Sequence, residues 1–119
     1  MAGDEDLPDS EDFPDTGLLR VEAVGDRTGA TVIAVGHLDE GSSGLLLDAV
    51  ERVLATRPRA IAIDASGLTF VNSSGLAALL RARHAVMTEA GLAFRIVDPS
   101  PALRRTAELA GFERLLGAE

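Results

Sequence analysis

Residues 61–76 read Ile-Ala-Ile-Asp-Ala-Ser-Gly-Leu-Thr-Phe-Val-Asn-Ser-Ser-Gly-Leu, and this stretch decides the fold. Its first three residues form a short apolar run that is typical of a buried strand, which we expect to end at Asp64. A loop through Gly67 should follow. A helix closed by Gly91 comes next, because apolar residues recur at helical spacing in Leu76, Leu79, Leu80 and Met87. The stretch therefore predicts a strand that leads through a polar junction into an amphipathic helix.

The residues before this stretch predict two strands and a helix. Apolar and charged residues alternate over residues 19–23, and residues 30–35 form a nearly continuous apolar run. With a turn at residues 25–27, these two strands should pair as a hairpin. After a loop over residues 36–43, one helical face carries Leu46, Leu47, Val50, Val53 and Leu54. This helix should stop before Pro58.

The residues after the stretch predict one more strand and one more helix. The strand covers residues 94–97, and the helix covers residues 103–110, with Ser100 as its cap, Pro101 at its first position and Gly111 at its end. A final apolar turn contains Phe112, Leu115 and Leu116. The resulting order, β-β-α-β-α-β-α, predicts a single α/β domain in which helices pack on a small four-stranded mixed sheet.

The net charge of −8 is concentrated in an N-terminal tail, residues 1–16. This tail has no basic residue and seven acidic ones: Asp4, Glu5, Asp6, Asp9, Glu11, Asp12 and Asp15. Without them, 12 acidic residues face 11 arginines, so the domain of residues 17–119 is nearly neutral. The tail carries too little apolar surface to offset the cost of ordering, and we expect it to be disordered. It serves either for solubility or as a docking or regulatory arm.

Composition excludes several classes of function. There is no cysteine, and His37 and His84 are far apart, so we expect neither a metal site nor a cofactor. The arginines are scattered, which is not typical of a nucleic-acid-binding face. No apolar run reaches the ~18 residues that span a bilayer. The acidic N-terminus is unlike a secretory signal. The sequence therefore predicts a cytoplasmic protein that binds neither membrane nor nucleic acid.

The polar junction before the second helix is the segment that can carry chemistry. Asn72, Ser73, Ser74 and Gly75 are residue types that begin helices, because their side chains or backbone satisfy unpaired N–H groups. The same N–H groups and the positive end of the helix dipole favour a phosphate. A phosphoserine there would add about −1.5 to −2 charges. Physics alone favours a simple cap and leaves phosphorylation as the alternative.

The motif Asn72-Ser73-Ser74-Gly75-Leu76 resembles the signature of the STAS family, found in anti-sigma factor antagonists, whose helix begins with Asp-Ser-Ser-Gly-Leu. Gly36-His37-Leu38-Asp39 resembles the family's Gly-Glu-Leu-Asp loop, and residues 103–116 resemble its closing helix. The resemblance covers about residues 18–117. The chain departs from the pattern twice, with Asn72 in place of aspartate and His37 in place of glutamate.

This resemblance implies a partner switch. The antagonist binds an anti-sigma factor that is also a serine kinase, and phosphorylation of the second serine, here Ser74, separates the complex. Asn72, Ser73 and Gly75 are then neighbours of the phosphate, with Ser73 mainly a capping residue. ATP and Mg²⁺ belong to the kinase, a serine phosphatase resets the switch, and the chain is a monomer or weak dimer. The implied partner-binding residues are His37, Asp39, Asn72, Ser73, Ser74 and Leu76.

Two other functions remain open. The first is a STAS scaffold or a subunit of a stress-signalling complex, in which the serine is never phosphorylated. The second is a small serine-dependent enzyme. A nucleophilic Ser74 would need glycine two places before and after it, where Asn72 and Leu76 stand. A phosphate-binding Walker loop needs a lysine, and the chain has none.

Overall fold

The computed structural model describes residues 11–12, 18–26 and 28–117. Its strands form one sheet in the order in which they occur along the chain. They are β1 (Glu11–Asp12), β2 (Leu19–Asp26), β3 (Gly29–Leu38), β4 (Ala60–Val71) and β5 (Ala93–Val97). β2 pairs antiparallel with both β1 and β3, whereas β4 pairs parallel with both β3 and β5. The predicted mixed sheet is therefore confirmed, with a two-residue edge strand in addition to the four expected strands.

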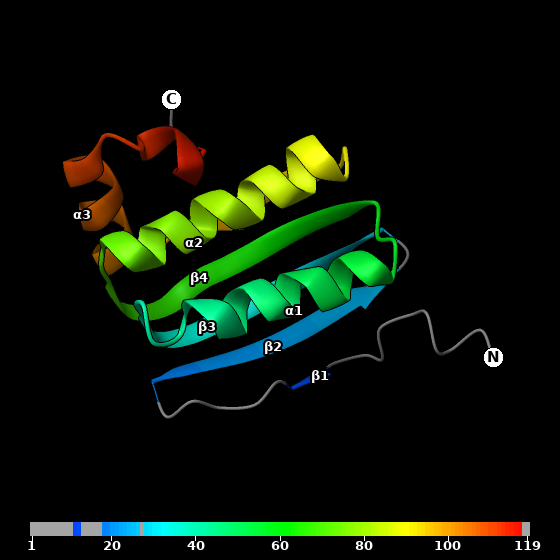
Figure 1. Ribbon diagram of the computed structural model, residues 1–119, viewed down its shortest axis with the longest axis horizontal. Helices are drawn as coiled ribbons and strands as arrows, with labels where there is room; N and C mark the ends of the chain where they lie inside the picture. The colour runs from blue at the N-terminus through cyan, green and yellow to red at the C-terminus, as the bar shows by residue number, and fades with distance from the viewer. Residues whose placement is uncertain (1–10, 13–17, 27, 118–119) are drawn as a thin grey trace.

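The helices lie over one face of this sheet (Figure 1). They are α1 (Ser43–Ala55), α2 (Ser73–His84), the π-helical turn η2 (Ala85–Glu89) that continues α2, α3 (Pro101–Ala110) and the 3₁₀ turn η3 (Glu113–Leu116). α1 and α2 run side by side, and α3 lies near the start of α2 (Figure 1). Since β3 and β4 are parallel, the helices that follow them both start at the same end of the sheet. That end carries the serine motif.

Alternation along the strands produces the core. In their first halves the buried residues alternate with partly exposed ones: Ala30, Val32 and Ala34 in β3, and Ile61, Ile63 and Ala65 in β4. Successive side chains of a strand point to opposite faces, so all of these face the helices. Each large aliphatic side chain buried in this way contributes about 1.5–3 kcal/mol to stability. The apolar pattern read from the sequence is thus the pattern that joins sheet and helices.

The third helix begins and ends as predicted. The Ser100 hydroxyl accepts a hydrogen bond from the backbone N–H of Leu103 at 3.1 Å, and Pro101 is the first helical residue. Proline fits there because its missing N–H has no intrahelical acceptor to lose. Gly111 ends the helix with a φ of 80°, a conformation that glycine adopts without steric cost.

β3 and β4 are both longer than predicted. Residues 36–38 and 65–71, which we expected in loops, continue the parallel pair, with Gly36 opposite Leu68 and Leu38 opposite Val71. Two irregularities interrupt the register, one between Ile33 and Val35 and one between Gly36 and His37. These irregularities bend the ladder without ending it, so glycines that look like loop signals lie inside the strands. The predicted turn at residues 25–27 is also displaced, because residues 25 and 26 still belong to β2.

Two residues of the acidic tail take part in the sheet. Glu11 lies opposite Ala23 and Asp12 opposite Glu22, which makes β1 an edge strand beside β2. The other residues of the 1–16 tail lie outside the described residues, so the predicted disorder there stays a prediction.

Candidate functional site: the serine junction at the start of α2

Asn72 is the residue that caps α2. Its backbone is extended, and its side-chain oxygen accepts a hydrogen bond from the Gly75 N–H at 3.0 Å. Its own carbonyl accepts the first helical hydrogen bond, from Leu76 N at 2.9 Å. The prediction that Ser73 serves as the capping residue is wrong, because Ser73 is already inside the helix and is exposed. Ser74, half-buried, follows it in the first turn.

Gly75 permits the close approach of α2 to the end of β3. A Cβ atom at this position would overlap the carbonyl oxygen of Leu38, which is backbone and cannot swing aside. The role of Gly75 beside the serine is therefore structural: it brings the serine turn (residues 72–75) against β3. The Asn72 N–H points to the same Leu38 carbonyl at 3.4 Å.

The loop between β3 and α1 is held by its own hydrogen bonds. The Asp39 carbonyl accepts from the N–H groups of Ser42 and Ser43 and from the Ser43 hydroxyl, the last at 2.6 Å. The Asp39 carboxylate accepts from Gly41 N at 2.9 Å. Ser42 is 1% exposed, and its hydroxyl donates to the His37 carbonyl at 2.7 Å and accepts from Asp39 N. Asp39, a predicted partner contact, therefore also organises the loop.

Two polar contacts join this loop and the start of α1 to the serine turn. The Asn72 side-chain amide donates to the Glu40 carboxylate at 3.0 Å, and the Ser43 hydroxyl, whose one hydrogen is shared with the Asp39 carbonyl, lies 3.4 Å from the Ser74 carbonyl. The structure thus brings His37, Asp39, Asn72, Ser73 and Ser74 to one end of the sheet, as the sequence predicts. Sequence reasoning missed Glu40 and Ser43, because nothing local in either segment indicates contact with residues more than 30 positions away.

An exposed aromatic residue extends this surface. Phe70 is 44% exposed, and its ring lies 5.5 Å from the His37 ring, tilted by 48°. Phe70 also lines a hollow of about 420 Å³ between the end of β4 and the start of α3, together with Arg105. The Thr106 hydroxyl donates to the Val71 carbonyl at 2.6 Å and fixes α3 there. Sequence analysis missed Phe70, although its place two residues before the serine motif is a usable signal.

One predicted partner-binding residue does not reach the surface. Leu76 is 2% exposed and belongs to the core cluster under α2. Its position on the apolar face of the helix, one turn after the cap, directs its side chain to the sheet and not to a partner. Leu76 therefore supports the serine turn from beneath.

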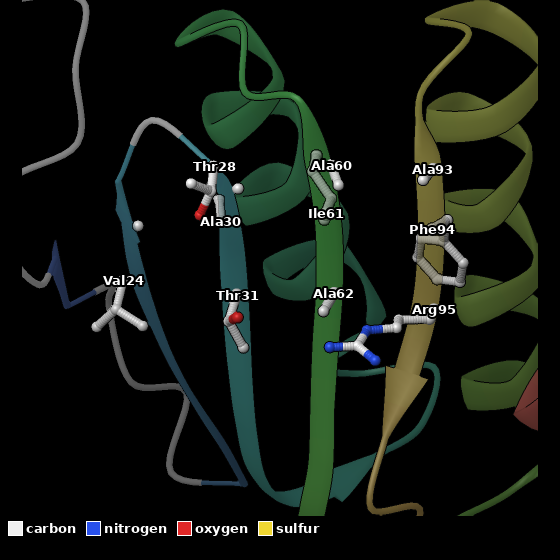
Figure 2. Close-up of a pocket in the computed structure, with 12 residues that line it drawn as sticks. Val24, Thr28, Ala30, Thr31, Ala60, Ile61, Ala62, Ala93, Phe94 and Arg95 are labelled. Atoms are coloured by element: carbon white, nitrogen blue, oxygen red, sulfur yellow. The ribbon is translucent and has the colours of Figure 1, made fainter.

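A second hollow lies at the opposite end of the parallel strands (Figure 2). Its volume is about 560 Å³, and it is lined by the beginnings of β3, β4 and β5 and the end of β2. Most lining residues are small, and Arg95 is the charged one; Figure 2 shows its side chain reaching towards Ala62. Within the described residues, no three His, Asp or Glu side chains gather as a metal site would require. No helix in the described part of the chain has both the length and the apolar character for crossing a bilayer.

Known structures share this architecture. The crystal structure of an anti-sigma factor antagonist from Mycobacterium paratuberculosis is 25% identical, with a TM-score of 0.72 over 87% of each chain. SpoIIAA in its unphosphorylated form gives 19% identity and a TM-score of 0.64, covering 82% of this chain and 84% of that one. The Bacillus cell fate determinant SpoIIAA in its phosphorylated form is 17% identical, with a TM-score of 0.61, over 82% of this chain and 87% of that one. At the identities of the two SpoIIAA structures the likeness shows the fold alone.

Sequence comparison agrees with the structural one. Among curated protein sequences none matches the chain. A family model described as "Mlab, STAS domain" matches residues 22–117, which runs from β2 to the end of η3 and includes the serine junction. The chain belongs to the STAS domain family.

Proposed function

We propose that the chain is an anti-sigma factor antagonist whose binding is switched off by phosphorylation of Ser74. The observation that carries the proposal is the position of Ser74, in the first turn of α2, with its carbonyl oxygen 3.4 Å from the Ser43 hydroxyl at the start of α1. Similar structures support it: one is that of an anti-sigma factor antagonist, and another protein occurs in both phosphorylated and unphosphorylated forms. The resemblance of the serine motif to the family signature gives the same residue.

The geometry explains how a phosphate at Ser74 could act as a switch. First-turn N–H groups have no intrahelical acceptor, and the helix dipole places partial positive charge there, so the helix can tolerate a phosphate. The surface around it, formed by residues 37–43, Phe70 and the serine turn, would gain about two negative charges. A phosphate in a packed interface and beside acidic side chains disrupts binding by desolvation and like-charge repulsion, so a partner on this surface should be expelled. Binding lost a hundredfold corresponds to about 2.7 kcal/mol.

The chemistry of the proposed switch belongs to other proteins. The partner is an anti-sigma factor with serine kinase activity, which supplies ATP and Mg²⁺, and a serine phosphatase removes the phosphate. The chain itself is substrate and ligand, not an enzyme, and acts in the cytoplasm as a monomer or weak dimer. It needs no cofactor of its own. Its exposed Phe70 provides the aromatic anchor that partner surfaces often use.

Binding of the purified kinase-type anti-sigma factor to substituted proteins tests the proposal. Ser74→Ala should bind as the wild type does, and Ser74→Asp should bind about a hundredfold more weakly, which is about 2.7 kcal/mol. Thr88→Asp is the matched control, since it adds the same charge to an exposed residue in η2, at the far end of the same helix. Equal binding by Ser74→Asp and Thr88→Asp would contradict the proposal.

Mass spectrometry after incubation with the kinase and ATP tests the assignment of the serine. One phosphate should appear on Ser74 and none on Ser73. Labelling of Ser74→Ala as strong as that of the wild type would move the site elsewhere. Sizing separates the switch from a scaffold role: we expect the mass of one or two 12.4 kDa chains, whereas a far larger particle would favour the scaffold.

A further inference from the structure

Both ends of the Asn72 amide are in use. The oxygen accepts from Gly75 N at 3.0 Å and caps α2, while the NH₂ group donates to Glu40 Oε1, also at 3.0 Å. The cap requires an acceptor towards the helix, so the donor has to face the loop. An aspartate at this position could cap the helix equally well. It would have no N–H for Glu40 and would set two carboxylates against each other.

Glu40 is held by a loop that has little freedom. The neighbouring Asp39 and Ser42 exchange hydrogen bonds, and Ser42 is buried. The Ser43 hydroxyl, at the start of α1, donates to the Asp39 carbonyl and lies 3.4 Å from the Ser74 carbonyl. The Glu40 side chain itself is exposed. Its carboxylate is therefore positioned at the start of α2 by a fixed backbone on one side and by Asn72 on the other, yet a binding partner can reach it.

We propose that Glu40 is the charged recognition residue of the serine surface, formed by residues 37–43, Phe70 and residues 72–75, and that Asn72 positions it. The partner should offer a cationic side chain, arginine or lysine, to the Glu40 carboxylate. Charge-assisted hydrogen bonds of this kind are stronger than neutral ones, particularly when arginine is the donor. Position 72, where the family pattern has aspartate, is neutral here, and the carboxylate beside it is that of Glu40. This inference rests on the proposed function, because it names a recognition residue for the same partner.

A pair of substitutions can move the charge while keeping the hydrogen bond. In Glu40→Gln the carboxylate is lost. In the double variant Glu40→Gln/Asn72→Asp, the new amide at position 40 can donate to the new carboxylate at position 72. Donor and acceptor then exchange places, and the new carboxylate still caps Gly75. Binding of the purified kinase-type anti-sigma factor is measured for the wild type, both single variants and the double variant. Glu51→Gln, an exposed glutamate further along α1, is the matched control.

Glu40→Gln should weaken binding about tenfold and reduce its dependence on salt. The double variant should regain at least about threefold of that loss, and Glu51→Gln should bind as the wild type does. Asn72→Asp alone should bring no gain in affinity. Wild-type affinity in Glu40→Gln overturns the proposal. So does a double variant as weak as Glu40→Gln, since the loss would then come from the loop and not from the charge.

Urea unfolding of the same four proteins needs no partner and separates two kinds of failure. The changes in the free energy of unfolding caused by Glu40→Gln and Asn72→Asp should be non-additive. Asn72→Asp alone, which leaves two carboxylates face to face, should be the least stable of the four proteins. Additive values would show that Asn72 does not position Glu40, whatever the binding results. If the wild type does not bind the anti-sigma factor while the unfolding data are non-additive, the proposed function fails and the contact stands. If the wild type binds and Glu40→Gln matches it, the function stands and this inference fails.

Discussion

The two ends of the parallel strands are built differently. Where β3 and β4 end, backbone and side chains are in close contact: Gly75 abuts Leu38, Asn72 caps a helix, and hydrogen bonds join the loop before α1 to the serine turn. Where β3, β4 and β5 begin, small residues leave a hollow of about 560 Å³ with Arg95 across it. The first end specifies a single arrangement of polar groups. The second end has space for larger side chains.

This difference leads to a ranking of substitutions, with the largest effect at the closest contact. Gly75→Ala should lower the free energy of unfolding by about 3 kcal/mol, because the new methyl group overlaps the Leu38 carbonyl and overpacking typically costs about 1–3 kcal/mol. Gly44→Ala is the matched control in the first turn of α1, where no atom lies within 4 Å of an added Cβ. It should be neutral or stabilising by up to about 1 kcal/mol. Urea denaturation measures both, and similar values for the two glycines would remove the distinction.

Loss of the cap at the crowded end should have an intermediate effect. Asn72→Ala removes the acceptor for Gly75 N and the donor for Glu40, and we expect a loss of about 1 kcal/mol, the usual contribution of an N-cap. Thermal and urea unfolding would both register it. Ser73→Ala serves as comparison and should change stability by no more than about 0.5 kcal/mol, since Ser73 is exposed. A larger effect at Ser73 than at Asn72 would mean that Ser73 caps the helix after all.

Deletion of residues 1–16 should change stability less than loss of the cap. Among the described residues, the tail contributes only the short pairing of Glu11 and Asp12 with β2, at the edge of the sheet. We expect the melting temperature to fall by less than ~5 °C, which corresponds to roughly 1 kcal/mol for a domain of this size. A larger fall, measured by differential scanning calorimetry, would show that the tail is docked on the domain.

The smallest effect is expected at the open end. Ala62→Val adds two methyl groups to a residue that lines the larger hollow. Valine suits a strand better than alanine does, so stability should stay within about 0.5 kcal/mol of the wild type or rise slightly. If urea unfolding instead shows that Ala62→Val lowers the free energy of unfolding nearly as much as Gly75→Ala does, both ends of the parallel strands are equally sensitive to substitution. The difference between the two ends is then contradicted.

Local sequence signals predicted the fold and the serine motif at the start of α2. They did not predict the parts of the site contributed by Glu40, Ser43 and Phe70. Ser100, Pro101 and Gly111 mark the bounds of α3 because capping depends on residues next to one another. The polar residues before α2 mark its start in the same way, although the cap is Asn72 and not Ser73. The extension of β3 and β4 escaped prediction because Gly36 and Gly67 resemble loop residues, and their strand character depends on each pairing with a distant partner. Glu40 was missed for the same reason, since its contact with Asn72 spans 32 positions in the sequence.

The parallel pairing of β3 and β4 also determines at which stage of folding the serine surface forms. Its two halves, the loop before α1 and the turn before α2, meet only after the chain between them has crossed over and the strands have aligned. Contacts between segments so distant in sequence form late during folding. Closing the chain between them costs conformational entropy before the strand pairing stabilises the contact. A short peptide that contains only residues 61–76 therefore lacks the surface, and so does a chain still emerging from the ribosome. A partner that contacts both halves of the surface therefore binds the folded domain and does not bind the incompletely folded chain.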